Sequence, residues 1–399
     1  MVAESNKANA GNTAFGILFF LSIVHCINDT LQSIITAVYP LLKDELMLTY
    51  AQIGLITMVY QISASVFQPV VGIVMDRHQK PWSLPVGMGF IFIGLLLLSY
   101  SDLFWMILVS VGMIGIGSSI FHPEASRLTA LASGGKRGLA QSLFQVGGNL
   151  GGSFGPLITA LIISPYGRHN ASFSSILALA GILFMIPICR WYASRINEWN
   201  QRRKQKVDTG ASMPLSVRKT VFVIGIIIVL IFSKYVYMES LRSYYTFYLI
   251  HKFGVSVQDS QYYLFIFLFA TAVGTLLGGP IGDKIGRKYV IWGSILGSAP
   301  FTLLMPHVGL AATVVLSFII GFILSSAFPA ILVYAQELLP YKIGMISGIF
   351  FGFAFGVAGI ASAVLGNYAD TYGIEYVYNV VAFTPLLGLI AYFLPNLKK

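Results

Sequence analysis

The stretch Gly72-Ile-Val-Met-Asp76-Arg77-His-Gln-Lys80 recurs 207 positions later as Gly279-Pro-Ile-Gly-Asp283-Lys284-Ile-Gly-Arg287. Each copy follows one long apolar segment and precedes another. Similar displacements relate three more pairs of stretches: Ser118–Phe121 and Ser325–Phe328, Tyr166-Gly167 and Tyr372-Gly373, and Asp29–Ser33 and Glu239–Ser243. The chain therefore consists of two copies of one unit, and a duplicated unit in a lipid-soluble chain is typical of transporters.

Composition places this chain in a membrane. Hydrophobic residues make up 56% of it and charged residues only 10%, with a mean hydropathy of +0.77. Apolar segments long enough to cross a bilayer core of about 30 Å recur along the whole sequence. Only helices and closed barrels satisfy the backbone in lipid, and these apolar runs are continuous rather than alternating. The sequence predicts an all-α polytopic membrane protein.

The apolar runs predict twelve transmembrane helices in two pseudo-symmetric six-helix bundles. We expect them near residues 15–41, 51–75, 82–100, 103–131, 138–164, 172–193, 218–250, 258–281, 289–306, 309–337, 343–368 and 376–395. The polar stretch 194–217 is then a cytoplasmic linker between an N-terminal bundle (1–193) and a C-terminal bundle (218–399).

Basic residues predict the orientation of the chain. With both termini in the cytoplasm, the outer loops hold only Lys43, Arg168 and Lys252. The other Lys and Arg residues lie on the cytoplasmic side, apart from Arg127, Lys234 and Arg242 within helices. This asymmetry follows the positive-inside rule. It explains the net charge of +10 without nucleic acid.

Ionisable residues inside three predicted helices indicate a polar cavity, because a charge in lipid costs several kcal/mol unless it has a partner or a cavity. One helix carries His25, Asp29 and Gln32 on one face, and its repeat equivalent carries Lys234, Tyr235, Glu239, Arg242 and Thr246. A third helix contains His122, Glu124 and Arg127 around Pro123, which removes one helical hydrogen bond.

Each of these residues has a transport interpretation and a structural one. Asp29 and Glu239 are either proton carriers or permanently ionised partners, Asp29 of His25 or a cation on another helix, and Glu239 of Arg242. Lys234 and Arg242 either bind an anionic substrate, or Arg242 pairs with Glu239 and Lys234 extends toward the membrane surface.

For the third helix we favour function, because packing alone does not explain His122 and Glu124 in a kinked helix. Arg127 lies near the cytoplasmic end, where we expect a gate ion pair with a loop carboxylate such as Asp76.

Neutral polar stripes extend the predicted cavity. One helix aligns Gln61, Ser65 and Gln68, and another aligns Gln141, Gln145 and Asn149. Interhelical hydrogen bonds, worth about 1 kcal/mol each, are the alternative to cavity lining. We favour cavity lining for Gln61, Gln145 and Asn149.

Two helices carry small residues at fourfold spacing, which permits close helix contact. They are Gly147, Gly151 and Gly155 in one helix and Gly348, Gly352, Gly356 and Gly359 in the other. Cys26 and Cys189 lie in different helices without metal-ligand spacing. With no nucleophile constellation or metal-ligand cluster in the sequence, we expect no enzyme activity, no cofactor and no metal. Duplicated charges without repeated pore rings also argue against a channel.

The two Gly-x-x-x-Asp-Arg/Lys loops, the twelve helices and the duplicated halves resemble the major facilitator superfamily. The first loop departs from the second by Gln79 in place of Gly286. The segment that ends in Gly155-Pro156 looks like an imperfect antiporter motif. Within the superfamily, the stretches His25–Asp29, Ser118–Arg127 and Gly138–Asn149 resemble the fosmidomycin resistance family of drug exporters. One departure is Val111, where drug antiporters often carry an arginine.

The resemblance implies a central cavity that two rocking bundles expose to either side of a bacterial inner membrane. It implies proton-coupled efflux of a small anionic or amphipathic drug such as fosmidomycin, and the alternative is a proton-coupled uptake symporter for an organic anion. The expected partners are substrate, protons and lipid, with a monomer as the functional unit. The predicted binding residues are His25, Asp29, Gln32, Gln61, His122, Glu124, Gln145, Asn149, Lys234, Glu239 and Arg242.

The repeated loops are expected to act as gate latches. Asp76 and Asp283 can accept hydrogen bonds from a helix N-terminus of the opposite bundle and pair with nearby cations. The predicted gating residues are Gly72, Asp76, Arg77, Arg127, Gly279, Asp283, Lys284, Gly286 and Arg287.

Overall fold

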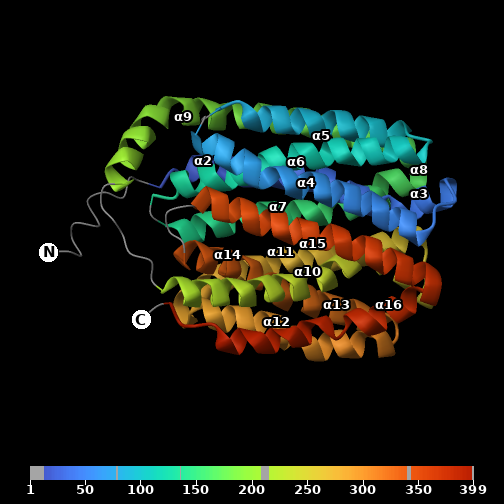
Figure 1. Ribbon diagram of the computed structural model, residues 1–399. Coiled ribbons are helices and arrows are strands. Elements are labelled where there is room, and N and C mark those ends of the chain that lie inside the picture. The colour runs from blue at the N-terminus through green and yellow to red at the C-terminus, as the bar shows by residue number, and fades with distance from the viewer. Residues whose placement is uncertain (1–12, 78–79, 135, 208–214, 339–342, 398–399) are drawn as a thin grey trace.

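A computed structural model describes residues 13–77, 80–134, 136–207, 215–338 and 343–397. These residues form helices and connecting turns, with no strand among them. Twelve helices are long and apolar enough to cross a membrane. The predicted fold class is confirmed. Figure 1 shows the helices nearly parallel, with the first half on one side of the molecule and the second half on the other.

The first half contains α2 (Phe15–Ala37), α3 (Tyr39–Glu45), α4 (Tyr50–Arg77), α5 (Ser83–Tyr100), α6 (Phe104–Ala132), α7 (Arg137–Ile158), the π-helical η1 (Thr159–Ile163), α8 (Ser164–Tyr166), the 3-10 helix η2 (Arg168–Ser174) and α9 (Ser175–Val207). Helix α9 continues 14 residues past its predicted end at residue 193, so the first part of the expected linker is helical. Its extra turns are rich in Arg, Gln and Lys, which favour helix outside a membrane.

The second half contains α10 (Val217–Phe253), α11 (Val257–Ile285), α12 (Arg287–Leu304), η3 (Met305–His307), α13 (Leu310–Ser325), α14 (Ala327–Leu338), α15 (Ile343–Tyr372), α16 (Ile374–Val381) and η4 (Thr384–Phe393). The predicted helix 309–337 is divided at Ser326 into α13 and α14. The last predicted helix is divided too, and its second part is a 3-10 helix.

The repeat appears in backbone geometry as well as in sequence. Gly167 and Gly373, which the repeat aligns, have φ of +92° and +87°. Each ends a long helix and lets the chain turn into the next one, in a conformation that a side chain would disfavour. The two halves therefore reverse direction by the same device.

Glycines bring the two halves together along α4 and α15. A Cβ added at Gly366 would lie 2.5 Å from the carbonyl oxygen of Tyr50, and one at Gly352 would lie 2.9 Å from that of Ser65. The glycines of α7 serve a different contact, within the first half. A Cβ at Gly151 would lie 2.0 Å from the Cys26 carbonyl oxygen, so α7 packs directly on the backbone of α2. Both stripes allow the close helix approach that their spacing predicted.

Candidate functional site

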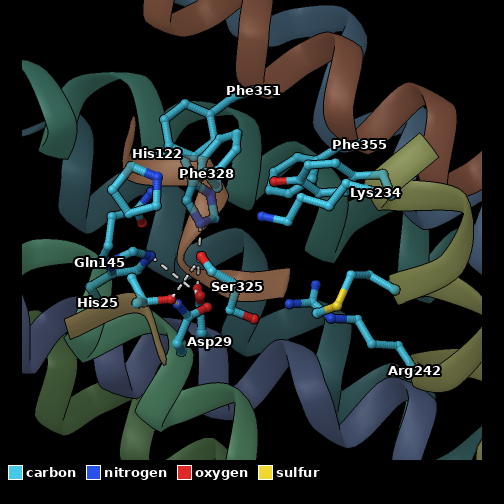
Figure 2. Close-up of a pocket in the computed structure, with 15 residues that line it drawn as sticks. His25, Asp29, His122, Gln145, Lys234, Arg242, Ser325, Phe328, Phe351 and Phe355 are labelled. Atoms are coloured by element: carbon cyan, nitrogen blue, oxygen red, sulfur yellow. Dashed lines mark hydrogen bonds and ion pairs between the residues drawn. The ribbon is translucent and has the colours of Figure 1, made fainter. Parts of the chain in front are cut away.

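A pocket of about 80 Å³ lies between the two halves (Figure 2). Its lining residues come from α2, α6, α7, α10, α11, α13, α14 and α15. They are His25, Asp29, His122, Gln145, Asn149, Lys234, Tyr235, Met238, Arg242, Thr275, Ser325, Phe328, Pro329, Phe351 and Phe355. Helices that the repeat relates thus supply opposite walls of one space.

The first half contributes a cluster of two histidines and one aspartate. His25 and Asp29 lie one turn apart on α2, with His25 Nε2 3.3 Å from Asp29 Oδ2. His122 approaches from α6, with its Nε2 3.4 Å from Asp29 Oδ1. Both imidazoles are buried, whereas the Asp29 side chain is 25% exposed. The carboxylate is therefore the part of the cluster that the pocket can reach.

Backbone carbonyls orient both imidazoles. His25 Nδ1 lies 2.7 Å from the Phe144 carbonyl oxygen, and His122 Nδ1 lies 3.1 Å from that of Ser118. Because a carbonyl oxygen only accepts hydrogen bonds, His25 Nδ1 is the donor to Phe144, whereas His122 Nδ1 also lies 3.0 Å from the Ser118 hydroxyl, which can donate or accept. The His25 ring also stacks on Phe144, with ring centroids 4.0 Å apart. Each Nε2 consequently points toward Asp29.

The second half contributes two cations, both from α10. The buried Lys234 ammonium lies 5.3 Å from the centre of the Tyr235 ring and 5.1 Å from that of Phe328. The half-buried Arg242 has a buried Nε without a hydrogen-bond partner. Within the described part of the chain neither cation has an anionic partner. Figure 2 shows them across the pocket from the histidine cluster.

Four of the predicted binding residues lie outside the pocket lining. Buried Glu239 accepts a hydrogen bond from Ser243 Oγ at 2.6 Å, and no ion pair joins it to Arg242 among the described residues. Gln32 accepts hydrogen bonds from the hydroxyls of Tyr60 and Ser118. Gln61 is buried against α15, where its Cβ would lie 2.8 Å from a Cβ added at Gly359.

The fourth of these residues, Glu124, forms a buried ion pair with Arg127 one turn later. Arg127 Nε lies 2.9 Å from Glu124 Oε2, and Nη2 lies 2.8 Å from Oε1. Arg127 also donates to the Tyr192 hydroxyl on α9. Arg127 therefore has a partner on its own helix, while the side chain of Asp76, the loop carboxylate that we expected, lies outside the described residues. The spacing of three residues, which puts both groups on one helical face, explains this pairing.

Asn149 and Gln145 lie where cavity lining was expected. Asn149 Nδ2 donates to Thr275 Oγ1 at 2.7 Å, a hydrogen bond between α7 and α11 that joins the two halves beside the pocket. The pocket residues that sequence reasoning missed are chiefly Thr275, Ser325 and the phenylalanines. The repeat aligns Thr275, Ser325, Phe351 and Phe355 with polar residues of the first half, which is their one sequence signal, whereas Phe328 aligns with Phe121 and had none.

The predicted gating residues receive only partial description. The side chains of Asp76, Arg77 and Asp283, and the surroundings of Gly279, lie outside the described residues. Gly72 is buried, Lys284 is exposed, and Gly286 turns the chain into α12 with φ of +101°. Arg287 Nη1 lies 2.5 Å from Glu337 Oε1 on α14, a contact within the second half.

A contact between the halves that sequence reasoning missed lies at the end of the molecule opposite the termini. Asp370, in the last turn of α15, accepts hydrogen bonds from the backbone N–H groups of Tyr50 at 2.9 Å and Ala51 at 2.7 Å. These groups begin α4, where a helix N-terminus favours a negative charge. Asp370 therefore joins the two halves at this end of the molecule.

Twelve spanning helices in two similar halves around a charged central pocket define a multi-pass membrane transporter rather than an enzyme. A family model of the Major Facilitator Superfamily matches residues 21–363 and, in a second match, residues 227–399. The chain belongs to the major facilitator superfamily.

Particular relatives narrow this assignment. The chain is 55% identical to the fosmidomycin resistance protein of Escherichia coli, over 99% of this chain and 95% of the relative. It is 40% identical to an uncharacterized MFS-type transporter of Bacillus subtilis, over 99% of this chain and 97% of that one. Among solved structures, the fucose:proton symporter of Escherichia coli has a TM-score of 0.67 at 15% identity, covering 96% of this chain and 98% of the symporter. That likeness shows the fold.

Proposed function

We propose that this transporter exports a small organic anion of the phosphonate type, such as fosmidomycin, in exchange for protons. The observation that carries the proposal is the pair of cations Lys234 and Arg242, which have no anionic partner among the described residues, in the wall opposite a His–Asp–His cluster. The similar Escherichia coli protein is named for fosmidomycin resistance, and a membrane transporter that removes a drug from the cell produces resistance.

The second-half wall is the substrate-binding wall of this proposal. The planar guanidinium of Arg242 suits two oxygens of a phosphonate, and Lys234 adds a second positive charge. Phe328, Phe351 and Phe355 surround the remaining space and suit the apolar part of an amphipathic molecule. At about 80 Å³ the pocket is smaller than most ligand sites, so the bundles separate to admit the substrate.

The first-half wall is the proton-binding wall. Asp29 lies between two Nε2 atoms, so a proton bound here is shared by three groups. Buried Glu239, whose only hydrogen bond in the described structure is from Ser243, is the second proposed carrier. Glu124 is left out of this role because Arg127 neutralises it.

Alternating access in this proposal uses the two bundles, residues 1–193 and 218–399, as rocking units within a monomer. Asp370 keeps the two bundles together at the end opposite the termini. The Asp76 and Asp283 loops are the proposed latches at the other end. We assign that second end to the cytoplasmic face of a bacterial inner membrane. The basic residues Lys80, Lys284 and Lys288 lie next to these loops in the chain, which accords with the positive-inside rule.

One observation favours a second candidate, uptake of an organic anion together with protons. A proton on the Asp29 cluster makes the pocket more positive, so proton and anion strengthen each other's binding. Exchange instead requires the two ligands to bind in turn. The membrane potential, negative inside, favours outward movement of an anion and supports export.

Flux in proteoliposomes separates the two candidates. The purified chain is reconstituted, its orientation is measured by protease access, and fosmidomycin flux is followed under imposed pH gradients. Exchange predicts that fosmidomycin moves against the proton flow, whereas symport predicts that it moves with it. Fosmidomycin flux no greater than in protein-free vesicles, under gradients of either direction, would refute the proposed function.

A further inference from the structure

The His25–Asp29–His122 cluster has the composition of a metal site. Its three ligand atoms, two imidazole nitrogens and a carboxylate oxygen, lie within 4.8 Å of one another. We expected no metal because the sequence shows no metal-ligand cluster, and His122 lies on a different helix, far along the chain from His25 and Asp29. The fold brings α6 against α2 and thereby assembles the three groups.

Both imidazoles present Nε2 to this point. Their Nδ1 atoms face away from it, His25 Nδ1 toward the Phe144 carbonyl oxygen and His122 Nδ1 toward the carbonyl and hydroxyl oxygens of Ser118. This is the arrangement of metal-binding histidines, whose second nitrogen usually donates to a carbonyl or carboxylate. His25 Nε2 is buried without a hydrogen-bond partner although it faces Asp29. Two imidazole nitrogens that face a carboxylate need positive charge between them, which either protons on Nε2 or one metal ion can supply.

The spacing also fits a transition metal. The Nε2-to-oxygen distances are 3.3 Å for His25 and 3.4 Å for His122. Tetrahedral zinc with bonds of about 2.0–2.1 Å separates its ligand atoms by about 3.3–3.4 Å. The two imidazoles face different oxygens of Asp29, so the carboxylate binds through both oxygens or turns slightly to use one.

We propose that His25, Asp29 and His122 bind one divalent transition metal ion of the zinc type, with an open position toward the pocket. Two imidazole ligands favour zinc, cobalt or nickel over magnesium or calcium, which prefer oxygen ligands. The bound ion gives the cluster a net positive charge, since one carboxylate offsets only half of its charge.

The open position suits an oxyanion. Lys234 and Arg242 line the facing wall, so an anion between the walls contacts positive charge on both sides. This part of the inference rests on the proposed substrate class, whereas the metal site itself does not.

Zinc titration of the purified full-length chain, in detergent and without an affinity tag, tests the site. We expect one zinc ion per chain, no competition from magnesium, and the visible spectrum of tetrahedral cobalt when Co²⁺ is the probe. His122→Asn and Asp29→Asn each remove a ligand, and we expect at least about 10-fold weaker binding.

The matched control is His251→Asn. His251 also lies 3.4 Å from a carboxylate, that of Glu375, but the pair is exposed and lacks the second imidazole of the cluster. Zinc binding should be unchanged in this variant. Thr129→Ala keeps all three ligands and removes only a buried hydroxyl that donates to the Ala125 carbonyl oxygen of α6, so it shows whether a loss of binding in the ligand variants reflects a general effect of substitution in this helix. It should retain one zinc per chain.

Absence of saturable zinc binding in the folded wild-type chain would overturn the proposal. Equal binding in the wild type and both ligand variants would overturn it too. A second titration with methylphosphonate present tests whether an anion contacts the metal ion and the facing cations together. If it does, we expect about 10-fold tighter zinc binding. If methylphosphonate leaves zinc binding unchanged, the metal site stands, but the anion does not contact the metal ion and the cations together. Neither result depends on transport.

Discussion

The two walls of the pocket differ in whether their charged side chains have partners of opposite charge. On the first-half wall Asp29 has two histidine partners, and behind it Glu124 is paired with Arg127. On the second-half wall Lys234 rests on aromatic rings and Arg242 Nε has no partner. The repeat placed related helices around one space, and their side chains then diverged. One wall is internally neutralised, whereas the other is left to attract an anion from outside the chain.

The paired charges of the first wall stabilise the folded chain, whereas the cations of the second wall are suited to bind a ligand. A neutralised cluster contributes to the folded state, because removal of one member leaves an unpaired charge. An unpartnered cation is costly to the folded state and is retained for a ligand. Four predictions, from the largest expected effect to the smallest, test this division.

The largest effect is expected for the buried pair of α6. Glu124→Gln and Arg127→Met should each lower the free energy of unfolding by about 3–5 kcal/mol, because each leaves one buried charge unpaired. Arg242→Met should lower it little or even raise it. Denaturation in detergent measures all three. An equal loss in Arg242→Met and Arg127→Met would remove the distinction between the walls.

Substrate binding should show the reverse order. Arg242→Met should weaken fosmidomycin binding about 30-fold to 1,000-fold, equivalent to about 2–4 kcal/mol, because it removes a charged contact in a desolvated pocket. Arg218→Met, the same substitution at an exposed position of α10, is the control and should bind normally. Equilibrium binding to the purified chain measures both. Normal affinity in Arg242→Met would place the substrate elsewhere.

Gly148 tests how closely the first-half wall is packed. A Cβ there would lie 2.4 Å from His25 Nε2 and 2.7 Å from Asp29 Oδ2, so Gly148→Ala should displace the cluster. We expect a cost of about 1–3 kcal/mol and a 5-fold to 150-fold loss of proton-coupled flux. Gly152→Ala, one turn along α7 in open space, should transport normally. Equal flux in the two variants would show that the cluster tolerates displacement.

The smallest effect concerns what holds the walls together. Asp370→Asn keeps the size of the side chain but removes its charge at the N-terminus of α4. Because Asp370 is exposed, we expect only about 0.5–1 kcal/mol, a 2-fold to 5-fold shift toward opening at that end. Labelling of a cysteine at buried Ser362 reports the opening. Glu375→Gln, at an exposed carboxylate on α16, is the control. If Asp370→Asn does not change the labelling, Asp370 is not a latch.

Much of the fold was predictable because lipid imposes a simple rule. Apolar segments of spanning length must be helices, and the repeated loop shows that the helices come in two sets. Helix ends were less predictable where polar residues continue a helix into water, as α9 does to Val207. The division at Ser326 did have a local signal, because Ser325 and Ser326 are polar and Pro329 cannot donate the helical hydrogen bond to the Ser325 carbonyl, but hydropathy alone does not register it.

The candidate site was predictable in part. Because a charge in lipid costs free energy, we selected His25, Asp29, His122, Lys234 and Arg242 from the sequence, and all five line the pocket. The same argument also selected Glu124 and Glu239, which lie elsewhere. The free-energy cost of a charge in lipid does not by itself show whether a buried charge lines a cavity or pairs with a residue on its own helix.

The sequence by itself determined that this chain spans a membrane twelve times as two related halves, because hydropathy and repetition are properties of residue order. It also determined which residues are too polar for lipid. Local helical spacing pairs Arg127 with Glu124, but only the tertiary structure decided two other sets of partners: His122 with Asp29, and Asp370 with the start of α4. The last two contacts join different helices, and helix packing alone sets which side chains meet across such a distance in sequence.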